Sequence, residues 1–98
     1  MDMKIVYRPH LKIRLKQRNI PFNYPKQIIE SPEKEYFDTL AKRNIAIKKL
    51  LLEGKLRNMI VAYDKIRNNI EIVTIHVISN KEIWNKVKTG RWRKNEKN

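Results

Sequence analysis

Residues 70–78 read Ile70-Glu71-Ile72-Val73-Thr74-Ile75-His76-Val77-Ile78. This run is almost continuously apolar and rich in β-branched side chains, which is typical of a strand covered on both faces. We therefore expect it to be the central strand of a sheet. Regular alternation would place His76 on the same face as Ile70, Ile72, Thr74 and Ile78.

The sequence before this run predicts further strands of an antiparallel meander. Residues 55–65 alternate in character, with Met59, Val61 and Tyr63 on one side, and residues 43–52 are rich in isoleucine and leucine. Turns are predicted at Glu53-Gly54 and at 67–69. Residues 35–38 are a candidate for a fourth strand, and residues 4–7 are β-prone but short.

Helices are expected on either side of this meander. Residues 9–18 begin with a proline, which suits the first turn of a helix, and carry Leu11 and Leu15 four positions apart. A second short helix is expected at 25–30. Ser79 or Asn80 would cap a last helix that ends at Gly90, and its apolar stripe would be Ile83, Trp84 and Val87.

Together these elements predict an α+β domain. It would have two N-terminal helices, an antiparallel sheet of three to four strands and one C-terminal helix. A chain of 98 residues falls in the size range of a single domain. We expect that domain to span residues 1–94, and residues 95–98 to form a disordered tail.

The chain is strongly basic, with 23 Lys and Arg against 10 Asp and Glu and a formal net charge of +13. No acidic residue occurs from Met3 to Ile29, and a second basic cluster lies near the C-terminus. AT-rich coding would account for part of the lysine excess, but less well for the arginines. This balance is typical of domains that bind a polyanion, and nucleic acid is the first candidate.

The composition argues against several other classes. Without cysteine there is no disulfide or thiolate site, and the two histidines lie far apart in sequence, so neither a metal nor another cofactor is predicted. Gly54 and Gly90 are the only glycines, too few for a phosphate-binding loop. No apolar run reaches the length of a membrane span, about 18 residues, and no signal-peptide apolar region follows Met1. We expect a cytoplasmic protein without a membrane contact.

The strongest local pattern is His10-x-x-x-Arg14-x-x-x-Arg18. A spacing of four places successive members on one helical face. The N-terminus of a helix disfavours a histidine cation, so a neutral His10 could act as a base near pH 7, while the two arginines hold a phosphate. The alternative is a solvated basic face on which His10 is incidental.

The predicted strands add further candidates. His76 either finds a hydrogen-bond partner in the core or emerges at the mouth of a sheet cleft. Tyr63 either belongs to the core or faces the same cleft. An open sheet face lined by Tyr63, Lys48 and Arg57 would be a cradle for RNA, and the alternative is a set of ordinary solvated strand residues.

Basic and aromatic residues also meet at the C-terminal end. The candidate nucleic-acid contacts outside the sheet are Lys12 in the first helix and, near the end of the chain, Lys88, Arg91, Trp92 and Arg93. A base could stack on Trp92, a contact worth about 1–3 kcal/mol, or Trp92 folds back onto the core and the arginines are merely solvated. Trp84 lies on the apolar stripe of the last helix and is expected to pack against the core.

Several of these segments resemble a known family. The stretch from Pro9 to Ile20 is similar to the opening "H…R…R.I" of small uncharacterised proteins of the RelE/ParE-like toxin superfamily. Residues 28–33, the strand at 59–63, the strand at 73–76 and the closing Gly90-Arg91-Trp92 also fit. The resemblance covers residues 7–93 and rests on short motifs.

The resemblance implies a toxin-like α+β domain with a curved antiparallel sheet. RelE-type relatives cleave mRNA on the ribosome without a metal, whereas ParE-type relatives poison gyrase. Where the motif aligns, His10, Arg14 and Arg18 are carried over as candidate site residues. Tyr63, His76 and Arg91 are added from their chemistry alone.

The function expected from the sequence is a metal-independent mRNA endoribonuclease of a type II toxin-antitoxin system. His10 or His76 would take the ribose 2′-hydroxyl proton, Arg14 and Arg18 would stabilise the phosphate, and Tyr63 or the second histidine would protonate the leaving oxygen. RNA or the ribosome, and an acidic antitoxin, are the expected partners. A non-catalytic nucleic-acid-binding module, a gyrase-targeting toxin, and either a monomer or a dimer stay open.

Overall fold

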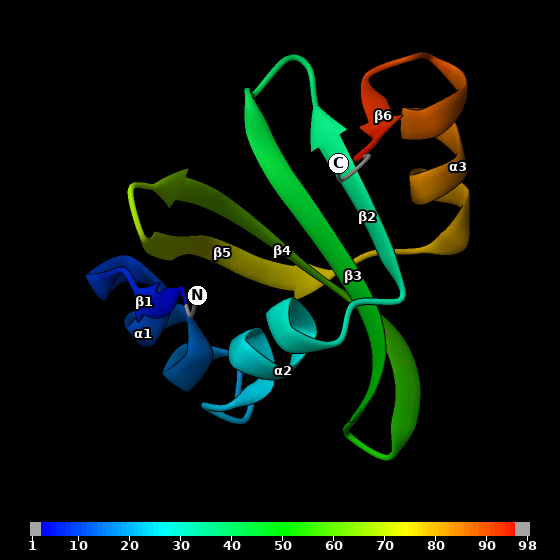
Figure 1. Cartoon of the computed structure of the whole chain (residues 1–98). Helices are drawn as coiled ribbons and strands as arrows, with labels where there is room; N and C mark the ends of the chain where they lie inside the picture. The colour runs from blue at the N-terminus through cyan, green and yellow to red at the C-terminus, as the bar shows by residue number, and fades with distance from the viewer. Residues whose placement is uncertain (1–2, 96–98) are drawn as a thin grey trace.

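The computed structural model describes residues 3–95 and arranges them around one curved sheet (Figure 1). The helices are α1 (Pro9–Gln17), α2 (Tyr24–Glu30) and α3 (Asn80–Lys88). The strands are β1 (Lys4–Tyr7), β2 (Lys34–Asp38), β3 (Arg43–Leu52), β4 (Lys55–Ile66), β5 (Asn69–Val77) and β6 (Trp92–Lys94). Among the residues described, no helix is long and apolar enough to cross a membrane.

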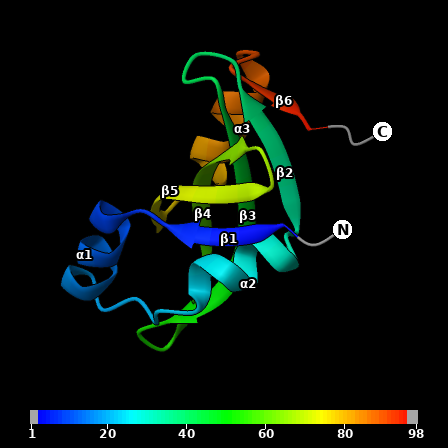
Figure 2. The same cartoon turned by 60° about the vertical axis from the view of Figure 1, so that its left-hand side comes forward.

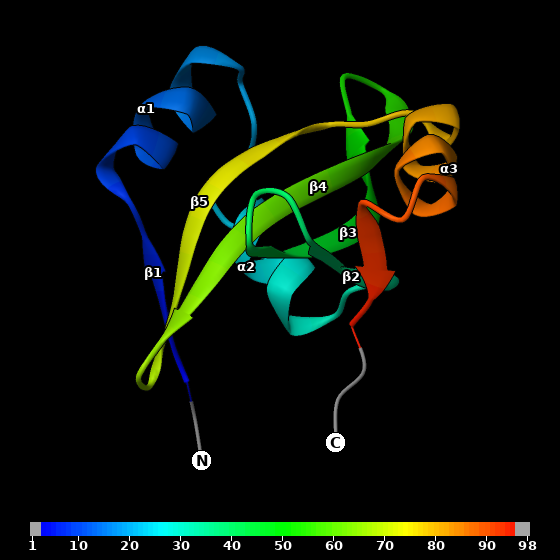
Figure 3. The ribbon, with the colours of Figure 1, turned by 90° about the horizontal axis from the view of Figure 1, so that it is seen from above.

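The six strands lie in the order β1-β5-β4-β3-β2-β6. β1 pairs with β5 in parallel, from Lys4 opposite Asn69 to Tyr7 opposite Ile72, and Figure 2 shows the two strands side by side. All other neighbours are antiparallel. Figure 3 shows β4 and β5 curving through the molecule, with α1 and α3 toward opposite sides of the sheet.

The predicted fold is wrong in its sheet and in the placing of its helices. The sheet is mixed and six-stranded rather than antiparallel with three to four strands. A strand precedes α1 and another follows α3, so the helices are enclosed between strands. The long run at 70–78 lies next to the edge strand rather than at the centre. β1 covers the β-prone residues 4–7 that were left out of the predicted sheet, and β6 was not predicted. Both strands are very short, and each pairs with a segment far away in the sequence.

Two apolar clusters, one on each face of the sheet, hold the domain together. The first lies under α1 and α2 and includes Leu11, Leu15, Ile28, Val61 and Ile72. The second lies under α3 and β6 and includes Ile45, Ile47, Ile60, Ile83 and Trp92. The two faces are called the α1/α2 face and the α3 face below.

A β-bulge in β5 decides which face His76 occupies. Tyr63 pairs with Ile72 but Ala62 pairs with Thr74, so Val73 is an extra residue on β5. The bulge reverses the alternation for the rest of the strand. Ile72 faces α1 and α2, whereas His76 lies opposite Ile60 on the α3 face. The expectation that His76 shares a face with Ile70 and Ile72 is therefore wrong.

A local sequence feature defines each end of α3. Ser79 Oγ accepts from the backbone N–H of Glu82 at 3.1 Å, and the Glu82 carboxylate accepts from the backbone N–H of Ser79 at 3.0 Å, which is a capping box. After the helix, Gly90 has a φ of +80°, a conformation that favours glycine. This turn carries the chain back so that β6 can pair with β2.

Asn95 continues this edge instead of beginning a tail. Its backbone N–H donates to the carbonyl of Glu35 at 3.2 Å, and its side-chain amide donates to Asn44 Oδ1 at 3.0 Å. The remainder of the expected tail, residues 96–98, lies outside the described residues.

Candidate functional site

The outer edge of β5 becomes free where β1 ends. β1 pairs with β5 only as far as Ile72, and the chain then leaves the sheet to form α1. Arg18, just after α1, reaches back to this edge, and its Nη1 donates to the carbonyl of Ile75 at 3.0 Å. The guanidinium thus replaces a strand neighbour and is fixed next to the following residue, His76.

His76 is a solvent-accessible imidazole among cations. Partial desolvation lowers its pKa below the ordinary 6.5, and the Arg18 cation lowers it further. From α3, the Glu82 carboxylate opposes these effects and the Lys86 ammonium adds to them. The net result is a histidine that is neutral at pH 7 and lies in the field of two nearby cations. This combination suits a general base that acts beside a bound phosphate.

Glu82 contributes a fixed negative charge rather than a second titrating group. Its hydrogen bonds from the backbone and the hydroxyl of Ser79 lower the pKa of its carboxyl. Because the capping box already engages this carboxylate, Glu82 orients the start of α3. The charged groups acting on His76 come from two places: Arg18 at the end of α1, and α3, which contributes Glu82 from its first turn and Lys86 from its last. We call His76, Arg18 and Lys86 the β5-edge site.

His10 and Arg14 form a separate pair on α1. Arg14 Nε donates to His10 Nε2 at 3.2 Å, so the spacing of four does bring them together as the sequence suggested. The same bond uses the lone pair that a general base needs, and His10 can serve as a base only if Arg14 moves away. The structure therefore joins His10 to Arg14 and Arg18 to His76, rather than gathering all four.

Tyr63 belongs to the hydrophobic core. Its side chain is 3 % exposed and packs in the cluster under α1 and α2. Burial, together with the nearby Glu35 carboxylate, raises the pKa of Tyr63 to about 12. It is on the opposite face from His76, so its assignment as a catalytic residue has to be corrected.

The expected RNA cradle of Lys48, Arg57 and Tyr63 is also not an open face. Strand alternation places all three on the α1/α2 face. Lys48 Nζ donates to the carbonyl of Ser31 at 2.9 Å, at the end of α2, and Arg57 is half-buried. Their positions fit structural roles better than a shared nucleic-acid surface.

The α3 face beyond His76 carries charges of both signs. Arg8 bridges Asp64 at 3.0 Å and Glu71 at 3.2 Å, and Arg43 reaches Asp64 at 3.3 Å. These pairs neutralise one another locally. The positive field on this side of the sheet is therefore concentrated around the β5-edge site and α3.

Trp92 and Arg91 are bound into the protein around one carboxylate. Trp92 is 4 % exposed, its Nε1 donates to Asp38 Oδ2 at 3.1 Å, and Arg91 Nε donates to Asp38 Oδ1 at 3.1 Å. Burial alone would raise the pKa of Asp38, but hydrogen bonds from the Ala41 backbone, Arg91 and Trp92 outweigh it and lower the pKa to about 2. Stacking of a base on Trp92 is excluded by this burial, and we call this group the Asp38 cluster.

The remaining predicted contacts are exposed but dispersed. Lys12 on α1 and Lys26 on α2 both line a hollow that runs along β1. Arg93 is exposed on the edge strand β6. Lys88 Nζ lies 4.6 Å from the centroid of the Trp84 ring. None of these three joins the β5-edge site in the part of the chain that the structure describes.

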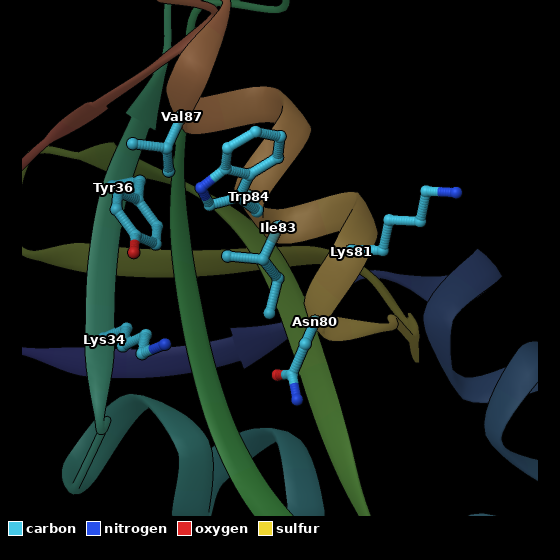
Figure 4. Close-up of a pocket in the computed structure, with 7 residues that line it drawn as sticks. All are labelled: Lys34, Tyr36, Asn80, Lys81, Ile83, Trp84 and Val87. Atoms are coloured by element: carbon cyan, nitrogen blue, oxygen red, sulfur yellow. The ribbon is translucent and has the colours of Figure 1, made fainter.

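The sequence interpretation missed Lys86 near His76 and misplaced Trp84. Trp84 is 59 % exposed although it was expected to pack against the core. Figure 4 shows it on α3 beside Val87, facing Tyr36 on β2. Its sequence position gave a usable signal, because consecutive residues of an α-helix are rotated by 100°, which turns Trp84 away from the direction of the buried Ile83.

Known proteins offer no match to set beside this geometry. No family model matches the chain. No curated protein matches it, and no solved structure does. Within residues 3–95, no group of three or more His, Asp or Glu side chains is arranged to hold a metal ion. The resemblance to RelE/ParE-like toxins stays a prediction that rests on the residues of this chain.

Proposed function

We propose that this protein is a metal-independent endoribonuclease of the toxin type, with His76 as its general base. The observation that carries the proposal is the environment of His76, whose pKa is lowered by desolvation and by the Arg18 cation. A lowered pKa supplies the lone pair at neutral pH, and the same cations attract the phosphate whose neighbouring hydroxyl must be deprotonated.

The chemistry follows from these groups. His76 takes the proton of a ribose 2′-hydroxyl, and the resulting oxygen attacks the adjacent phosphorus. Arg18 and Lys86 stabilise the extra negative charge of the pentacoordinate phosphate. The bond to the 5′-oxygen then breaks, that oxygen takes a proton from water, and the products are a 2′,3′-cyclic phosphate and a 5′-hydroxyl.

The pair of His10 and Arg14 has a different role in this proposal. Arg14 lies one helical turn before Arg18 and His10 one turn earlier still. Together they extend a line of donors along α1 away from the scissile phosphate. We assign them to binding of a neighbouring phosphate, which the Arg14 guanidinium can reach once it releases His10.

The test is incubation of labelled mRNA in EDTA, with and without translating ribosomes, using the wild type, His76→Ala and His10→Ala. We expect His76→Ala to slow cleavage by about 10²- to 10⁴-fold, the range for loss of a general base, while RNA binding is retained. His10→Ala is the matched control and should slow cleavage far less. Cleavage by His76→Ala at the wild-type rate would rule out this assignment.

A non-catalytic nucleic-acid-binding module is the second candidate, and the net charge of +13 favours it. It predicts that the wild type binds RNA in a strongly salt-dependent manner but does not cleave it under any of these conditions. An acidic antitoxin segment that folds onto the basic surface is the proposed protein partner under the toxin function. Action on translating ribosomes would place the protein in the cytoplasm.

A further inference from the structure

Trp84 is the least expected exposed side chain of this protein. Among the described residues of α3, Ile83 is buried, whereas Trp84, the next residue, is 59 % exposed. Val87 beside it is 42 % exposed. A large aromatic ring that is exposed to water next to another apolar side chain marks a surface whose burial by a binding partner is favourable.

The ring borders a hollow between α3 and β2. This hollow has a volume of about 580 Å³, and its apolar lining comes from Tyr36, Ile83, Trp84 and Val87. Figure 4 shows Trp84 and Val87 on the helix facing the Tyr36 ring on the strand. Tyr36 is held from behind, because it stacks on the buried Trp92 with ring centroids 5.5 Å apart. This contact restrains the Tyr36 ring that lines the hollow.

The rim of the hollow is cationic. Lys34 on β2 and Lys81 on α3 line it, and Lys88 lies over the Trp84 ring. The acidic residue of α3, Glu82, is engaged in the capping box. Glu33, which directly precedes β2, accepts a hydrogen bond from the backbone N–H of Lys49 on β3 at 3.1 Å. An occupant that combines a flat ring with negative charge complements this arrangement.

We infer that Trp84 and the adjoining hollow form a nucleobase subsite for single-stranded RNA. One base stacks on the indole, and Lys34, Lys81 and Lys88 contact the flanking phosphates. The inference rests on the proposed function, since it extends the path of the RNA beyond the β5-edge site. Glu82 and Lys86 lie on one flank of α3 and Trp84 lies on the other. A single RNA strand therefore reaches both sites only if it is long enough to cross the helix.

The two tryptophans make the test specific. Trp92 is 4 % exposed and Trp84 is 59 % exposed, so intrinsic fluorescence that responds to an added strand reports Trp84. The probe is a 2′-O-methyl oligouridylate of about 12 nucleotides, within the usual range of single-strand site sizes. It cannot be cleaved because the attacking hydroxyl is blocked. An abasic oligomer of the same length and charge is the matched probe without bases.

We expect the oligouridylate to quench the fluorescence and the abasic oligomer to bind without quenching. Trp84→Leu should weaken oligouridylate binding by about 5- to 150-fold, the value of one stacked base, and leave abasic binding unchanged. The remaining Trp92 signal verifies that this variant is folded. Lys81→Ala should weaken binding of both probes equally, because it removes a phosphate contact only.

Three results would overturn the subsite. They are equal quenching by both probes, unchanged oligouridylate binding by Trp84→Leu, and self-association in sedimentation that Trp84→Leu abolishes, which would make this face a contact between copies of the chain. The proposed nuclease is tested separately. Quenching without cleavage would remove the nuclease and retain the subsite, whereas cleavage without quenching would remove the subsite alone.

Discussion

The β5-edge site and the Asp38 cluster both place an arginine beside a titratable side chain, but with opposite results. Around Asp38, the protein itself supplies donors to both carboxylate oxygens, including Arg91 and Trp92. Around His76, Arg18 is bound to a backbone carbonyl and the imidazole remains accessible. One cluster is complete within the fold, and the other leaves both a base and positive charge facing solvent. Such incomplete pairing is what a substrate-binding site requires.

The largest difference between the two clusters is expected from removing their arginines. Arg18→Ala should reduce cleavage by about 10²- to 10³-fold, as for the loss of a charge-stabilising donor, with little change in stability. Arg91→Ala should leave the rate constant of the folded enzyme unchanged and lower the free energy of unfolding by about 1–3 kcal/mol. Cleavage assays and urea denaturation of both variants check this. A stability loss for Arg18→Ala as large as that for Arg91→Ala would remove the distinction.

Asp38→Ala should be the most destabilising single change in the Asp38 cluster. It leaves the buried Trp92 N–H and the turn N–H groups of Leu40 and Ala41 without their acceptor. We expect the free energy of unfolding to fall by about 3 kcal/mol, measured by urea denaturation. Glu71→Ala, which removes a more exposed carboxylate from Arg8, is the control and should cost less than about 1 kcal/mol.

Acid should weaken the fold through the same carboxylate. The folded pKa of Asp38 is about 2 and its ordinary value is 3.8, so its contribution is present above pH 3.8 and is lost as the pH falls toward 2. The loss should amount to about 2 kcal/mol. Urea denaturation as a function of pH measures it, and Asp38→Asn should lack this part of the acid dependence. If the free energy of unfolding of Asp38→Asn falls with acid as much as that of the wild type, other carboxylates are responsible for the acid dependence.

Arg14→Ala gives the smallest expected effect. It frees His10 from its hydrogen bond and removes one cation from α1. Cleavage should fall by about tenfold or less, and the salt dependence of RNA binding should decrease by about one phosphate contact. A loss as large as that of Arg18→Ala would move the catalytic centre onto α1. Competition binding over a series of salt concentrations provides the measurement.

Local sequence signals located most of the helices and long strands, but not the sheet that they build. Proline at the start of α1 and the Ser79 capping box are short-range features, and the structure has helices there. Membership of β1 and β6 depends on pairing with Asn69–Ile72 and Tyr36–Asp38, which lie far away along the chain. Four-residue and three-residue strands carry too little pattern to indicate such partners.

Prediction of the candidate site from the sequence was limited by tertiary effects of the same kind. Nothing in the Val73-Thr74 sequence marks a bulge, yet the bulge moves His76 to the other face of the sheet. Both tryptophans lie in the basic C-terminal segment, and the Asp38 carboxylate binds only Trp92. His10, Arg14 and Arg18 follow one another at intervals of four residues. Only Arg18 donates to the Ile75 carbonyl at the free edge of β5, which places it beside His76. The sequence indicated which residues were candidates for the site, but not which of them lie together in the fold.

The most direct test of His76 as the general base is the pH dependence of cleavage by the wild type and His76→Ala. A general base must be unprotonated, so the rate should rise with pH and level off above the pKa of His76. Because that pKa is lowered from 6.5, we predict an inflection below pH 6.5 that is absent from the residual activity of the variant. An inflection that persists in His76→Ala, or a wild-type rate that falls as the pH rises through this range, would contradict it.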